Sequence, residues 1–341
     1  MAIQTSEIKL VKSVTVNDTT ANGGRMSATD VADGVKNNVW PDVPQAERTA
    51  GSVKYRKLFI KIANDDDLAL IDPKVFIETH TPGDDTIVMM AGTQTDTQAE
   101  ADDYTRFYGT GDLDADVNSG VSSIAVNVES GNASAGDNVF QNGDLIRISS
   151  QDGVDNPTGE TEFIRLDASS GVSWNGDKAT LTFDTGVTLA NTYTAASTRV
   201  GAVIEASNIE VLFDTWGESS ASGTYDETTN PPVLDAIGSI EQTWTLTFSD
   251  ATNFTCVGNI AGSVGSGSIG GGDFAPNNTD FSKPYFTLAD AGWAGTWANG
   301  DTVSFTSHPA SVPLWLKRTV PAGANSLSGN KVIPAVSGES S

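Results

Sequence analysis

Short runs of alternating apolar and polar residues recur along the chain, and they predict β-strands rather than helices. The clearest run is Glu241–Phe248, in which Trp244, Leu246 and Phe248 fall on one face and threonines fall on the other. A second run, Tyr55–Ile62, alternates basic with apolar residues. Turn-forming Gly, Asn and Asp residues separate such runs. The pattern therefore predicts an all-β protein built from sandwich or barrel elements.

The strand signals fall into groups that predict the organisation of the chain. Residues 1–53 are typical of an extended, irregular N-terminal arm, with one helical turn between Pro44 and Ala50. Residues 54–120 and 205–320 are assigned to one β-rich core domain. Residues 121–204 hold five short strand signals, which predict an inserted small β-domain. Residues 321–341 are typical of an extended C-terminal tail.

The two terminal segments are predicted to depend on other subunits for their order. Residues 17–38 and 323–341 are rich in Gly, Asn and Ser and cannot form a core of their own. An irregular segment as long as the N-terminal one is unusual in a lone domain. We therefore expect both segments to become ordered only when they pack on a neighbouring subunit.

Composition and charge exclude several classes of function. The 341 residues include 44 acidic and 19 basic ones, for a net charge of -25. The net charge is -1 over residues 1–80, -14 over 81–200 and -10 over 201–341. Such a chain lacks the basic surplus of a phosphate-neutralising nucleic-acid binder. Its single cysteine excludes an internal disulfide, and no apolar run is long enough for a membrane span. The N-terminus lacks the apolar segment of a secretory signal, so we expect synthesis in a cytoplasm.

Two short motifs resemble ligand sites but lack the context that such sites need. Gly265–Gly270 matches the G-x-G-x-x-G string, yet further glycines and Pro276 follow where a dinucleotide site needs a helix. We interpret it as a flexible glycine loop. Asp112–Asp116 begins like an EF-hand loop but has Val117 and Ser123 at the positions of the essential Gly and Glu. We interpret it as a solvated acidic turn.

The candidate catalytic residues are few. His80 and His308 are the only histidines, and neither stands in a metal-binding or nucleophile motif. Cys256 is predicted to be a small buried residue. Trp293 and Trp297 flank a glycine and suit either a sugar-stacking platform or, in our preferred interpretation, core residues that close a turn. We expect no catalytic, cofactor-binding or metal-binding residues, and hence no enzyme and no cofactor.

Several strings resemble those of virion structural proteins from tailed bacteriophages and Mu-like prophages. The resemblance covers most of the chain, and its motifs are structural rather than catalytic. The strings that carry it are Ser13–Asp18, Gly23–Ser27, Lys61–Asp67, Gly143–Ile148, Lys283–Leu288, Trp293–Trp297, Gly300–Phe305 and Val312–Ala324.

The resemblance implies a self-assembling subunit of a virion, and within this group the major tail tube protein is our first choice. Tail tube proteins stack as hexameric rings around a β-barrel, engage a tape-measure protein, and pass DNA through an acidic lumen without binding it specifically. A strongly acidic chain that repels DNA suits such a conduit. The implied partners are thus further copies of the chain and other tail proteins, with no membrane involved.

Three other interpretations remain open. The chain fits a baseplate, tail-tip or capsid-decoration protein of the same virion class. It also fits a host-receptor or glycan-binding module that uses Trp293 and Trp297. The last of the three is a secreted glycan hydrolase, although the N-terminus lacks the signal segment that secretion would require.

Overall fold

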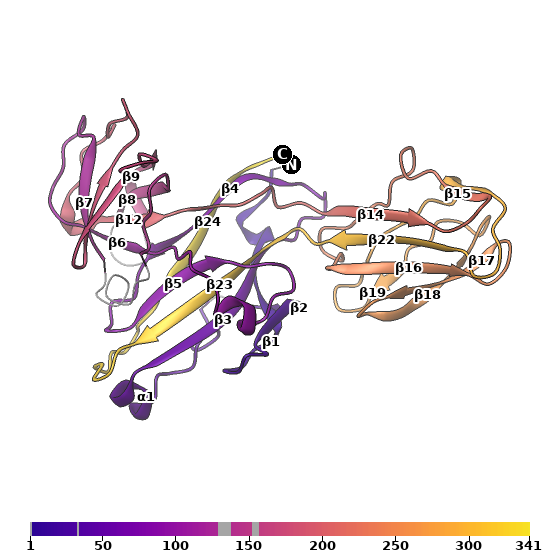
Figure 1. Ribbon diagram of the computed structural model, residues 1–341, viewed down its shortest axis with the longest axis horizontal. Coiled ribbons are helices and arrows are strands. Elements are labelled where there is room, and N and C mark those ends of the chain that lie inside the picture. The colour runs from indigo at the N-terminus through magenta and orange to yellow at the C-terminus, as the bar shows by residue number, and fades with distance from the viewer. Residues whose placement is uncertain (1, 33, 129–137, 152–156) are drawn as a thin grey trace.

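The computed structural model describes residues 2–32, 34–128, 138–151 and 157–341. The all-β prediction is confirmed, because antiparallel sheets make up nearly all of the regular structure. The molecule is elongated, and three groups of strands follow one another along its longest axis (Figure 1). We call them the insert module (110–202, at the left), the core module (2–109, 203–211 and 309–341, in the middle) and the sandwich module (212–308, at the right).

The core module consists of two sheets that share one hydrophobic cluster. The larger sheet has the order β2-β1-β3-β23-β5, and the smaller has the order β13-β4-β24. Three short helical turns lie on their margins. The bounds are η1 (Thr5–Glu7), β1 (Ile8–Thr15), β2 (Gly23–Asp30), α1 (Gln45–Ala50), β3 (Ser52–Ile62), β4 (Leu70–Thr79), β5 (Thr86–Ala91), α2 (Gln98–Ala101), β13 (Ile204–Glu205), β23 (Ser311–Val320) and β24 (Ile333–Ser340).

Strand β3 is the centre of the core module and is buried on both faces. Leu58, Ile60 and Ile62 point from one face into the cluster shared with β4 and β23. Lys57 and Lys61 fall on the opposite face, because side chains alternate along a strand, and both are also buried. The basic-apolar alternation therefore marks a central strand whose lysines need partners inside the protein.

The insert module is one seven-stranded sheet wrapped around its own hydrophobic cluster. Its order is β10-β11-β7-β6-β12-β8-β9. The bounds are β6 (Thr110–Leu113), β7 (Ser123–Val128), β8 (Leu145–Gln151), β9 (Pro157–Arg165), β10 (Val172–Asn175), β11 (Lys178–Thr182), η2 (Ala195–Ser197) and β12 (Thr198–Ala202).

The sandwich module packs a five-stranded sheet, with the order β14-β22-β16-β17-β18, against short strands and loops over an aromatic core. The bounds are β14 (Leu212–Glu218), β15 (Gly223–Tyr225), β16 (Gln242–Phe248), β17 (Asn253–Gly258), β18 (Gly262–Ser268), β19 (Asn277–Asn278), β20 (Lys283–Pro284), η3 (Asp290–Gly292), β21 (Trp293–Gly295) and β22 (Thr302–His308).

The structure corrects the prediction of two irregular terminal arms. Within residues 1–53, β1 pairs with β3 from Ile8↔Ile62 to Lys12↔Leu58, and β2 pairs with β1. Within residues 321–341, β24 pairs with β4. Both segments thus contain strands that pair within the chain, because the neighbouring strands supply the backbone partners that their own composition cannot. The helical turn expected between Pro44 and Ala50 is confirmed as α1.

The structure also differs from the predicted division of the chain. Residues 54–120 and 205–320 do not form one domain: β14 to β22 build a separate sheet with a separate core, and only β13 and β23 from the second range join the core module. The inserted β-domain begins at β6, before residue 121, because β6 lies between β7 and β12 in the sheet.

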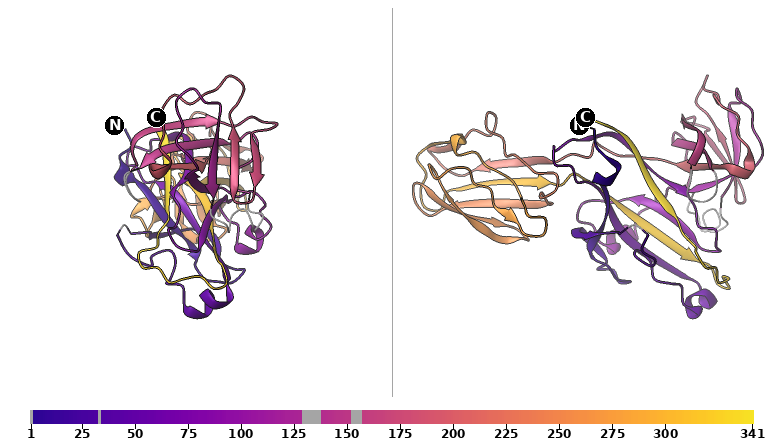
Figure 2. Two further views of the ribbon diagram at one scale, coloured as in Figure 1. Left: turned by 90° about the vertical axis from the view of Figure 1, so that its left-hand side faces the viewer. Right: turned by 180° about the vertical axis from the view of Figure 1, so that it is seen from behind.

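Buried polar groups connect the core module to its two neighbours, whose arrangement is also seen from behind in Figure 2. On the sandwich side, Lys61 Nζ donates to Ile237 O at 2.6 Å and lies 3.8 Å from the centre of the Phe281 ring. Burial lowers the pKa of Lys61 to about 8. On the insert side, Gln151 Nε2 donates to Glu78 Oε1 at 2.8 Å.

Candidate assembly surface

Each sheet of the core module ends on a strand that comes from one end of the chain. Strand β2 pairs only with β1, and β24 pairs only with β4. The two chain ends lie side by side in both views, and Ile3 N donates to Ser340 Oγ at 2.9 Å (Figures 1 and 2). The start of β2 is covered, because Gly23 bridges Thr97 and Gly24 N donates to Asp96 O at 2.9 Å. The outer backbone groups of the rest of β2 and of β24 have no strand partner among the described residues, so these parts of the edges can pair with another chain.

The exposed parts of these edges are polar. In β2 the last three residues, Ala28 to Asp30, are exposed, and in β24 the exposed residues are Ser337 to Glu339. Irregular register interrupts both pairings, and Pro334 removes one backbone donor from β24. Such features limit uncontrolled aggregation while leaving the strands open to a matching partner.

A stack of one tryptophan and two arginines holds the connection between β2 and β3 against the core sheet. The guanidinium carbons of Arg56 and Arg318 lie 4.9 and 4.6 Å from the Trp40 ring centre. Arg56 also pairs with Asp18 at 2.7 Å, and Arg318 donates to Pro41 O at 3.3 Å. Burial lowers the pKa of Arg318.

Four buried donor atoms in this stack have no acceptor among the described residues. They are Trp40 Nε1, Arg56 Nε, Arg318 Nε and Arg318 Nη2. Across the described ranges, no carboxylate forms an ion pair with Arg318. A buried donor without an acceptor destabilises a protein by about 1–3 kcal/mol.

A buried ion pair lies on the face of the core sheet opposite the tryptophan–arginine stack. Lys57 Nζ lies 2.5 Å from Asp96 Oδ1 and also donates to Gly24 O at 2.7 Å. Asp96 Oδ2 accepts from Tyr104 Oη at 2.5 Å and from Trp315 Nε1 at 2.8 Å. Burial would raise the pKa of Asp96, but these donors outweigh it and lower the pKa. The cluster thus anchors the segment after β5 to the sheet.

The three aspartates of the acidic run Asp112–Asp116 bind different partners. Asp112 accepts from His80 Nε2 at 3.0 Å and pairs with Arg199 at 2.9 Å. Asp114 pairs with Lys178 at 2.8 Å, and Asp116 accepts from a backbone N–H. In the part of the chain that the structure describes, no three His, Cys, Asp or Glu side chains are arranged to hold a metal ion.

The glycine string is not the loop that we expected. Gly265–Gly270 forms the second half of β18 and the turn that follows it. A Cβ atom on Gly267 would lie 2.5 Å from Phe254, so glycine is needed there for close packing. No helix follows the string.

Cys256 lies in β17 and His308 at the end of β22, with β16 between the two strands. Cys256 is fully buried, as predicted, and burial raises its pKa to about 12. His308 Nδ1 lies 2.8 Å from Glu241 Oε2, and Nε2 lies 3.3 Å from Asp214 Oδ1. Burial would lower the pKa of His308, but the two carboxylates outweigh it and raise the pKa. The histidine is thus held between two acids, without a nucleophile.

Trp297 is a core residue, as our preferred interpretation predicted, and Trp293 is partly buried against the same core. Trp297 is 2% exposed and stacks on Phe248 with 4.3 Å between the ring centres and 9° between the planes. Trp293 lies 4.7 Å from the Tyr225 ring centre. The two indoles therefore do not form an exposed platform for a sugar.

Comparisons with protein-family models, with curated proteins and with solved structures find no match. Within the described ranges, no helix has the length and apolar character needed to cross a membrane.

Sequence reasoning missed the tryptophan–arginine stack. The sequence pattern assigned no role to Trp40, and Arg56 counted only as one of the basic residues in the run Tyr55–Ile62. One feature of the sequence could have revealed the stack: the run Tyr55–Ile62 mixes basic residues with apolar ones. Basic side chains in a buried strand require acidic or aromatic partners inside the fold.

Proposed function

We propose that this chain is a structural subunit of a tailed-phage virion and that it assembles into the stacked rings of a tail tube. The observation that carries the proposal is the pair of open strand edges, β2 and β24, one on each sheet of the core module. Pairing of such edges between copies extends both sheets from one subunit to the next and needs no further ligand.

The tryptophan–arginine stack supports the same proposal. Its four buried donors have no acceptor among the described residues, and buried polar groups in folded proteins usually have a partner. In an assembly, a carboxylate of a neighbouring copy would supply an acceptor for Arg318, which has no ion pair among the described residues, whereas Arg56 already pairs with Asp18. The chain carries 44 acidic residues, so acceptors are plentiful on any neighbouring copy.

Charge supports a role as a conduit rather than as a binder of nucleic acid. The core module has 20 acidic and 14 basic residues, the insert module 13 and 4, and the sandwich module 11 and 1. All three modules are net negative, so DNA passes such a surface without adhering to it. Ring order and the tape-measure partner rest on the resemblance alone.

Electron microscopy of the purified chain over a series of protein concentrations tests the proposal. We expect rings or tubes that grow with concentration. Discrete small particles at every concentration would overturn the tube assignment and favour a baseplate, tail-tip or capsid-decoration subunit instead.

A matched pair of variants tests whether the core edges carry the assembly. Ala28→Lys places a charge on the exposed end of β2 and is tolerated by the monomer, since the side chain there is exposed. Ser263→Lys places the same charge on β18, the exposed edge strand of the sandwich module. We expect the first variant to prevent assembly and the second to assemble normally. Equal assembly of both variants would exclude β2 as the contact.

A further inference from the structure

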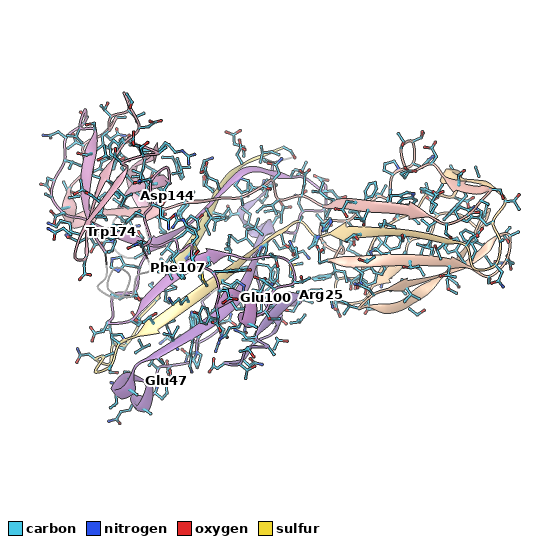
Figure 3. The ribbon with its side chains drawn as sticks, viewed as in Figure 1. Arg25, Glu47, Glu100, Phe107, Asp144 and Trp174 are labelled. Atoms are coloured by element: carbon cyan, nitrogen blue, oxygen red, sulfur yellow. The ribbon has the colours of Figure 1, made fainter. Side chains whose placement is uncertain are left out.

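A small concave site lies at the end of the insert module, where the loop before β8 meets β10. Its volume is about 400 Å³, and its walls are formed by Asn138, Phe140, Gln141, Asn142, Val172 and Trp174. Figure 3 labels Trp174 and, nearby on the same module, Asp144. The site is shallow and wide open to solvent, so a ligand would contact it on one side only.

The walls of this site are held in place by contacts that do not use its free polar groups. Asn142 connects the two walls, because Nδ2 donates to Ser169 O at 2.9 Å and Oδ1 accepts from Val172 N at 2.8 Å. Asp144 Oδ2 accepts from Gln141 N at 2.7 Å and from Arg106 Nη2 at 2.6 Å. The loop is therefore fixed from behind by its backbone and by Asn142.

Three polar groups remain available to a ligand. The side-chain amides of Asn138 and Gln141 form no hydrogen bond with any described residue, and neither does the indole Nε1 of Trp174. Trp174 is half-buried and lies against Phe140, with 6.3 Å between the ring centres and 28° between the planes. Two amides, one N–H donor and an aromatic wall thus surround one small volume.

We propose that this site binds a neutral saccharide. Amide groups both donate to and accept from hydroxyls, and the electron-rich face of an indole attracts the C–H groups of a sugar ring. The described residues that line the site are all uncharged, although the insert module has a net charge of -9. A nucleotide would also stack on an indole, but the surrounding charge repels its phosphate.

The inference is independent of the proposed tail tube function. It uses different residues on a different module, and it holds for any position of the subunit in a virion. An insert module that binds saccharides would give the subunit a second role at its surface, beyond assembly.

Saturation-transfer NMR of the full chain with glucose, galactose and N-acetylglucosamine as separate probes tests the proposal. Probe concentrations on the order of 10 mM detect ligands with Kd near 1 mM. We expect transfer to at least one of the sugars and none to glucose 1-phosphate. The absence of transfer to all three neutral sugars would overturn the proposal, and so would equal transfer to the phosphorylated sugar.

Variants locate the binding to this site. Gln141→Ala removes an exposed amide without disturbing the fold, and we expect it to weaken binding by about tenfold. Trp174→Ala is expected to abolish binding, and Trp174→Phe to retain part of it. Asn175→Ala is the matched control, because Asn175 is exposed on the same strand but does not line the site. Unchanged affinity in Gln141→Ala and Trp174→Ala would exclude the site.

Discussion

Replacing Lys57 by methionine tests how strongly the buried ion pair holds the core sheet together. Neither side chain reaches solvent to any extent, with exposures of 0% for Lys57 and 4% for Asp96. The ammonium has three acceptors, since Asp96 O accepts at 3.0 Å in addition to Gly24 O and Asp96 Oδ1. The substitution leaves all three without their donor and leaves the carboxylate charge buried.

The expected loss of unfolding free energy for Lys57→Met is about 3–5 kcal/mol, the range for removing one partner of a buried pair. Three acceptors at about 1 kcal/mol each give the same order of magnitude. The double variant Lys57→Met, Asp96→Asn removes the charge and keeps an acceptor for Trp315. We expect it to recover most of the loss, because a neutral amide tolerates burial better than a carboxylate.

Hydrogen-exchange mass spectrometry across a denaturant series measures this loss in peptides from β3 and β23. Arg165→Met is the control, because Arg165 and Glu205 are 42% and 48% exposed and solvent screens their attraction. The control should lose less than about 1 kcal/mol in its own peptides. A loss for Lys57→Met as small as that of the control would refute the reasoning, since it would mean that water reaches the pair.

Three further outcomes follow from the geometry. Burial lowers the pKa of Lys61 to about 8, so above pH 8 the folded protein has lost a proton that the unfolded chain keeps up to about pH 10. The free energy of unfolding should therefore rise with pH, by about 1.4 kcal/mol per pH unit between pH 8 and 10. Lys61→Met should flatten this rise in denaturant midpoints, and an identical rise in the variant would contradict the assignment. Gly23→Ala places a Cβ atom 2.6 Å from Trp315 at a φ of +103° and should lower the free energy of unfolding by about 2 kcal/mol or more. Gly323→Ala is the control: its φ is +85° and no atom lies within 4 Å, so the loss should be about 1 kcal/mol. Thermal unfolding of the two variants measures the difference. Cys256 should resist iodoacetamide at pH 8 until the protein unfolds, and rapid labelling of the native protein would show that the thiol is accessible.

The local strand signals were predictable because they depend on neighbours in the sequence. The run Glu241–Phe248 is strand β16, and its apolar face forms part of the aromatic core. Tyr55–Ile62 lies within β3. In both cases alternation alone decides which side chains are buried.

The terminal strands were missed because their stability comes from distant partners. Strand β1 alternates only weakly, since Lys9 and Lys12 interrupt its apolar positions. Strand β24 contains Pro334 and Gly338, which are unfavourable in strands on local grounds. Each nevertheless forms, because β3 or β4 supplies backbone hydrogen-bonding partners along most of its length.

The candidate sites were less predictable than the strands. The site at Trp174 joins a loop before β8 to strand β10, and the sequence gives no sign that these two segments meet. The stack at Trp40 likewise brings together residues from both ends of the chain. The sequence did indicate that Trp293 and Trp297 form no exposed platform for a sugar, because their small and apolar neighbours favour burial.

Both appended modules leave and rejoin the core on adjacent strands that pair with each other. In the sandwich module the first and last strands meet at Leu212↔His308, and in the insert module they meet at Thr110↔Gly201. A genetic exchange with breakpoints at either pair would replace a whole module and leave the core edges intact. The core is therefore suited to carry a different module at either position without any change in its own edge strands.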